Sequence, residues 1–146
     1  MTVTAPSNKL TWPQRFLIAL ALCVAGVVYA LGAFLDEFAE YPGERGSMLA
    51  IMMWFLPLSG VGALVSGLLL ASGFGCHGRM GCLITGLIAT GLSGAIDGTL
   101  NFPGFGTGLG PVFALGHIVQ FPLLGFVWLL LMAGVHMIAQ KIRGNR

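Results

Sequence analysis

Charged residues are scarce in this sequence, and their scarcity excludes most classes of soluble protein. Only 8% of the 146 residues are charged, whereas 56% are hydrophobic. A soluble domain usually carries about 25% charged residues. A chain of this length cannot bury so much apolar surface in its own interior, so we expect lipid to be its main solvent.

The sequence also lacks the short motifs that identify common enzymes and nucleotide-binding proteins. It contains no H-E-x-x-H and no G-x-S-x-G, so nothing in it indicates a protease or hydrolase site. The glycines of residues 101–111 do not follow a dinucleotide or phosphate-loop pattern, so no nucleotide is expected. The basic residues are spread along the chain and the net charge is only +2, so no nucleic-acid surface is indicated.

The few cysteines and histidines give no firm cofactor site, and no cofactor is predicted. Cys76, His77 and Cys82 form a C-H-x4-C pattern, but structural zinc usually takes four ligands with closer cysteine spacing. His117 and His136 are 19 residues apart in one expected helix. They would lie about 28 Å apart along its axis, which is too far for them to share a haem.

Four long uncharged stretches indicate four membrane-spanning helices. About 20 helical residues cross the roughly 30 Å hydrocarbon core of a bilayer. An open sheet would leave backbone groups unpaired in lipid, and stretches such as FLIALALCVAG lack the alternation of barrel strands. We therefore predict an all-α protein, a single transmembrane domain over residues 1–146 built as a four-helix bundle. The helices are expected near residues 13–35, 48–72, 80–97 and 112–140.

Acidic and basic residues alternate along the chain between these stretches. The acids lie between the first two helices and at Asp97, whereas six of the seven Lys and Arg lie in the other polar segments. Loops rich in Lys and Arg stay on the cytoplasmic side. The pattern predicts a bacterial-type inner-membrane protein with both termini cytoplasmic. The expected cytoplasmic segments are 1–12, 73–79 and 141–146, and the expected outer loops are 36–47 and 98–111.

The third expected helix carries small residues at regular spacing. Two adjacent stripes recur every four positions: Gly81, Thr85, Ala89, Ser93 and Asp97 in one, and Thr90, Gly94 and Gly98 in the other. The hydrophobic effect does not drive helices together in lipid, and small residues let their backbones approach closely instead. We therefore expect helix 80–97 to lie at the centre of the bundle, with packing inside the chain favoured over a dimer interface.

Polar residues gather near the expected outer ends of the helices. The candidate outer polar site consists of Asp36, Glu37, Asp97, His117 and Gln120. Carboxylates together with an imidazole can bind a divalent cation or relay protons. The alternative is that these acids are solvated at the membrane surface, with Asp97 paired to His117 or to nearby backbone. No metal is assigned to the site.

The segment NFPGFGTGLGP over residues 101–111 alternates glycine with larger residues and is expected to be an irregular outer loop. It could lie on the membrane surface as a lid over the outer acids, or re-enter the bilayer and expose carbonyl groups to an ion. The lid is favoured because lipid does not tolerate exposed irregular backbone. Pro57 and Pro122 are each expected to kink a helix.

Three functions are compatible with the sequence. The leading hypothesis is a non-catalytic subunit or assembly partner of a membrane complex, because no polar site is expected at the centre of the bundle. The second is a small oligomeric transporter or channel for a cation or small solute, with a polar site at the outer face. The third is a metal-dependent membrane enzyme that uses the carboxylate and histidine cluster. The expected partners are the lipid bilayer and either another membrane protein or a second copy of the chain.

Overall fold

The structure, a computed structural model, describes residues 10–40, 43, 45–76 and 78–144, apart from the side chains of Asp36, Glu37, Glu40 and Arg45. Over these residues the fold is entirely helical, and they contain no strand. The helices are α1 (Trp12–Glu40), α2 (Arg45–Leu70), α3 (Gly78–Asn101), α4 (Phe105–Gln120) and α5 (Pro122–Gly144).

Four of the described helices are long and apolar enough to cross a membrane, which confirms the expected all-helical fold with four apolar spans. The spanning stretches are Trp12–Leu35, Gly46–Leu70, Gly78–Asn101 and Pro122–Gly144. The shorter helix α4 was predicted only in part, with its residues 112–120 in the last spanning helix and its residues 105–111 in a loop.

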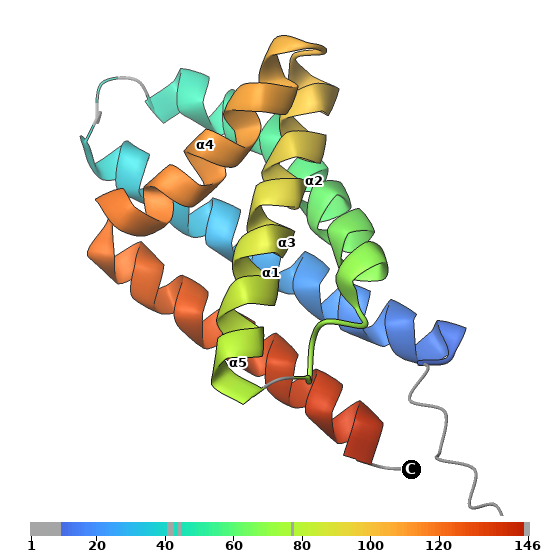
Figure 1. The fold of residues 1–146 in the computed structure, drawn as a ribbon. Helices are drawn as coiled ribbons and strands as arrows, with labels where there is room; N and C mark the ends of the chain where they lie inside the picture. The colour runs from blue at the N-terminus through green and yellow to red at the C-terminus, as the bar shows by residue number, and fades with distance from the viewer. Residues whose placement is uncertain (1–9, 41–42, 44, 77, 145–146) are drawn as a thin grey trace, which may run out of the picture.

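Helices α1 and α2 form an antiparallel hairpin, and α5 runs antiparallel to α1 (Figure 1). Small residues make the hairpin tight, since a Cβ atom added to Gly67 would lie 2.6 Å from the Cα atom of Ala19. A Cβ atom on Gly26 would similarly lie 2.6 Å from the Cβ atom of Ala63. Helix α3 packs against α2, α4 and α5, so it contacts most of the bundle.

The bundle has two ends that are built differently. At the end that we call the loop end, residues 71–76 join α2 to α3 beside the last turns of α5 (Figure 1). At the opposite end, the turn end, residues 102–104 join α3 to α4, and α1 is followed by α2. The chain therefore enters α1 and leaves α5 at the loop end.

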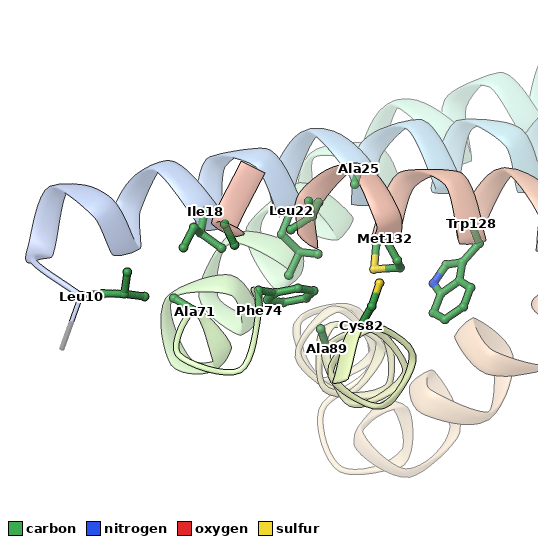
Figure 2. Packing of buried hydrophobic residues seen from close by; sticks show 12 residues of the cluster. Leu10, Ile18, Leu22, Ala25, Ala71, Phe74, Cys82, Ala89, Trp128 and Met132 are labelled. Atoms are coloured by element: carbon green, nitrogen blue, oxygen red, sulfur yellow. The ribbon is translucent and has the colours of Figure 1, made fainter. Parts of the chain in front are cut away.

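The loop end holds the tightly packed core. Ile18 and Phe74 are both 0% exposed, and they belong to one cluster with Leu22, Cys82 and Met132. Figure 2 shows Phe74 lying below Leu22, with the sulfur atoms of Cys82 and Met132 directed toward each other. Side chains from α1, α3, α5 and the loop thus pack together in one buried cluster.

Helix α5 also fixes the loop through its polar side chains. The Arg143 guanidinium donates hydrogen bonds to the carbonyl oxygens of Phe74 (3.1 Å) and Ser72 (2.8 Å). The backbone N–H of Gly75 donates to Nδ1 of the buried His136 at 3.2 Å. These bonds satisfy backbone groups just past the end of α2, where helical partners are missing.

The predicted helix 112–140 is two helices in the structure. The break falls at Phe121, whose backbone is extended (φ −115°, ψ 96°) and whose N–H donates to the carbonyl oxygen of His117 at 3.1 Å. Pro122 then opens α5. A residue before proline disfavours the helical conformation, and proline suits the first position of a helix. The expected kink at Pro122 is therefore a complete break, whereas Pro57 stays inside α2.

Residues 101–111 are not an irregular loop in the structure. Only residues 102–104 form a turn, and α4 begins at Phe105. The glycines of α4 face glycines of α3: Gly106 meets Gly98, and a Cβ atom on Gly94 would lie 2.6 Å from the carbonyl oxygen of Gly110. Glycine weakens a helix by about 1 kcal/mol relative to alanine, and close packing of two backbones offsets that loss in lipid.

Candidate functional site

A cavity of about 450 Å³ lies between the turn end and the middle of the bundle. All five helices contribute to its wall, which extends from Phe102 and Phe105 at the turn end to Ala89, Trp128 and Met132 near the middle. Most of the lining is apolar. We call this space the Asp97 cavity, after the acidic side chain on its wall.

A small polar network surrounds the Asp97 carboxylate. The Ser59 hydroxyl of α2 donates a hydrogen bond to Oδ2 of Asp97 at 2.9 Å. The Asn101 amide nitrogen donates to Oδ1 of Asp97 at 2.8 Å and to its backbone carbonyl oxygen at 2.9 Å. All three residues line the cavity. The network orients the carboxylate from two helices, α2 and α3.

The Asn101 side chain leaves an unused acceptor in this network. Its Oδ1 atom is buried and has no hydrogen-bond partner among the described residues. A buried carbonyl oxygen without a partner is unfavourable by about 1–3 kcal/mol. Because the atom has almost no accessible surface, a guest in the cavity would reach it only after the Asn101 side chain moves.

Three phenylalanines form an aromatic row across the turn end of the cavity. Phe55 of α2 lies between Phe34 of α1 and Phe102 of the turn, with ring centroids 6.5 Å and 6.4 Å apart. All three rings line the cavity. Such spacing is within the range of favourable aromatic pairs. The row therefore brings α1, α2 and the turn between α3 and α4 together through ring contacts.

Two further hydrogen bonds cross the deeper wall. The Trp128 indole N–H of α5 donates to the Thr90 hydroxyl of α3 at 2.9 Å, and that hydroxyl donates to the carbonyl oxygen of Gly86. The Tyr29 hydroxyl of α1 donates to the carbonyl oxygen of Ala114 in α4 at 2.8 Å. The polar groups of the wall therefore also join helices.

The first small-residue stripe of α3 faces α2 and the loop that follows α2. The Thr85 side chain lies 3.0 Å from where a Cβ atom on Gly73 would be, and the Ser93 backbone oxygen lies 2.7 Å from the corresponding position on Gly62. Gly81 and Ala89 are buried. Asp97, the last member of this stripe, thereby reaches Ser59 on α2.

The second stripe of α3 faces α4 and α5. Thr90 bonds to Trp128 of α5, whereas Gly94 and Gly98 contact the glycines of α4. The two stripes together place α3 between α2 on one side and the α4–α5 pair on the other, with the cavity alongside.

The structure brings only part of the predicted outer site together. Asp97 and His117 line the same cavity, whereas Gln120 is exposed at the end of α4. Nδ1 of His117 lies 2.8 Å from the carbonyl oxygen of Phe113, and its ring stacks on Phe121. His117 thus sits in the last turn of α4, not in the first turn of a long final helix.

Asp36 and Glu37 belong to α1, but their side chains lie outside the described residues, so their part in the site stays a prediction. Among the side chains that the structure does describe, no group of three or more His, Cys, Asp or Glu is arranged to hold a metal ion.

Sequence reasoning missed Ser59, Asn101, Tyr29 and Trp128. One signal for Asn101 was available, because it follows Asp97 by four residues and so lies on the same helix face. Ser59 carries no comparable signal, since its contact with Asp97 depends on how α2 crosses α3.

Comparisons with protein-family models, with curated proteins and with solved structures find no match to this chain.

Proposed function

We propose that this protein binds a small solute inside the membrane and acts as a small transporter, with the Asp97 cavity as its binding site. The observation that carries the proposal is the size of that cavity, about 450 Å³. The space opens partly at the surface of the bundle, and its size falls within the range of ligand pockets, about 300–1,000 Å³. A hydrogen-bonded carboxylate on an otherwise apolar wall supplies the orienting group that such pockets use.

The charge pattern supports an orientation for this transporter. Arg79, Lys141 and Arg143 belong to the loop end, and Arg15 lies in the first turn of α1. By the loop-charge rule this end faces the cytoplasm of a bacterial-type inner membrane. The Asp97 cavity then lies in the outer half of the bilayer, and a solute reaches it from outside.

The cavity favours the transporter over the other two functions considered. The subunit hypothesis was motivated by the expected lack of a polar site within the bundle, and the network of Ser59, Asp97 and Asn101 removes that motive. A metal-dependent enzyme has no supporting cluster among the described side chains. Neither alternative explains a hollow space beside a hydrogen-bonded carboxylate.

Trp128 offers a direct readout of solute binding. The chain contains three tryptophans, of which Trp12 and Trp54 are 73% and 67% exposed. Replacing both with phenylalanine leaves Trp128, which lines the cavity, as the only indole. The experiment titrates this variant in nanodiscs with 2-phenylethylammonium, 2-phenylethanol and phenylacetate. We expect at least one of them to change the Trp128 fluorescence saturably, and we expect proteoliposomes to take up that solute faster than protein-free liposomes.

A matched pair of variants separates the cavity from the lipid-facing surface. Ala33→Phe adds an aromatic ring to a cavity-lining position of α1, whereas Val28→Phe adds the same ring to an exposed position of that helix. Binding should be lost in the first variant and kept in the second. If none of the three probes changes the Trp128 signal, or if both variants behave alike, the proposed function is wrong.

A further inference from the structure

We infer that the solute is an organic ammonium ion, an apolar or aromatic body that carries a protonated amine with N–H donors. The inference rests on the proposed function and names its substrate class. It follows from three properties of the Asp97 cavity: its charge, its surplus of acceptors and its aromatic wall.

In the part of the chain that the structure describes, the cavity wall carries an acidic residue but no Lys or Arg. Asp97 is the only acidic residue among the described residues that line the cavity, and this lining contains no Lys or Arg. The other titratable lining groups are Tyr29 on α1 and His117 on α4, while α2 and α5 contribute none. An ionised carboxylate is stabilised away from water only when an opposite charge or strong donors compensate it. A cationic solute supplies that charge.

The hydrogen-bonding capacity of the wall points to an amine that has N–H groups. Each Asp97 oxygen accepts one bond, from Ser59 or Asn101, and a carboxylate oxygen can accept a second. A protonated primary amine offers three donors, which can bond to the remaining acceptor positions of the Asp97 carboxylate. A quaternary ammonium would leave these acceptors unused.

The aromatic residues of the wall suit the rest of such a solute. Phe34, Phe55 and Phe102 form their row on the same wall as Asp97, and Trp128 lies deeper in the cavity. Aromatic faces attract cations by about 0.5–2 kcal/mol and pack well against apolar bodies. An anion would meet the carboxylate and find no cation among the described lining residues, so this wall disfavours it.

The test compares the affinities of 2-phenylethylammonium, 2-phenylethanol and phenylacetate for the protein that retains only Trp128. The alcohol keeps the ring and one donor but has no charge. We expect the ammonium ion to bind at least about tenfold more tightly than the alcohol, which is the strength of one charge-assisted hydrogen bond. Phenylacetate should bind most weakly.

Asp97→Asn removes the charge with almost no change in shape, and the alcohol reports whether the cavity survives. In this variant the ammonium ion and the alcohol should bind within about twofold of each other, because only the charge preference is lost. If the alcohol or phenylacetate binds the unaltered protein as tightly as the ammonium ion, the substrate class is wrong while the proposed function stands. A preference for the ammonium ion that persists in Asp97→Asn also overturns it. Binding of none of the three probes refutes the proposed function itself.

Discussion

The two ends of this bundle solve the packing of membrane helices in opposite ways. At the loop end, large apolar side chains such as Ile18 and Phe74 interlock and are fully buried. At the turn end, α3 and α4 meet through glycine backbones, and a cavity of about 450 Å³ remains beside them. One end is filled by side chains, and the other is held by backbone contact around a hollow.

This difference indicates a division of tasks along the helices. A packed core fixes the relative positions of α1, α3 and α5, and the Arg143 bonds hold the loop between α2 and α3. Glycine contacts at the turn end then join α4 to α3 without filling the space next to Asp97. The packed end provides rigidity, and the hollow end provides a surface that a solute can occupy.

The largest expected effect comes from emptying the packed end. Phe74→Ala removes a ring that is 0% exposed, and we expect it to lower the free energy of unfolding by about 3 kcal/mol through lost contacts and a new void. Phe113→Ala removes the same ring from the cavity wall, where it is 62% exposed. That change should stay within about 0.5 kcal/mol, because lipid replaces the lost contacts.

Unfolding by SDS titration in mixed micelles measures both free energies under one set of conditions. The contrast between a filled end and a hollow end requires that more protein surrounds Phe74 than Phe113. Equal losses of unfolding free energy for Phe74→Ala and Phe113→Ala would therefore contradict it.

The second effect concerns the glycine contact at the turn end. In Gly106→Ala the new methyl group would overlap the backbone of Gly98, and we expect a loss of about 2 kcal/mol in stability, typical of overpacking. In Gly108→Ala nothing lies within 4 Å of the new methyl group. This control should be neutral or stabilising by up to about 1 kcal/mol, since alanine favours the helix.

The same SDS titration checks this pair, and fluorescence transfer between labels on α3 and α4 reports whether the two helices separate. A neutral Gly106→Ala would show that α4 is not held against α3 by its glycines, and the glycine-rich segment would then resemble the flexible loop that its composition predicts.

The four spans could be predicted because each is a long apolar stretch, a property of local sequence alone. The first part of helix α4 could not, since six glycines and prolines from Pro103 to Pro111, read one by one, indicate a flexible chain. Their helical state depends on Gly94 and Gly98 of α3, which compensate for the weak helix propensity. A spacing of four between Gly106 and Gly110, matching that of Gly94 and Gly98, was the available signal.

The residues of the candidate site were likewise predictable only in part. Asp97 was identifiable because an acid inside an apolar stretch is rare and needs a partner. The position of His117 in the last turn of α4 was not, because it depends on the break before Pro122. Ser59 was not predictable either, since a serine in an apolar helix gives no sign of which neighbour it will face.

The smallest expected effect lies where the packed end gives way to the hollow end, at the bond between Trp128 and Thr90. Hydrogen bonds between membrane helices are worth about 0.6 kcal/mol on average, so Thr90→Val should lower stability by roughly that amount. Trp128→Phe should lower it more, because it also trims a side chain that is only 3% exposed. Because both changes remove the same bond, the double variant should lose less than the sum of the two single losses. Strict additivity in this cycle would mean that the bond contributes nothing and that apolar packing alone holds α5 against α3 at this depth.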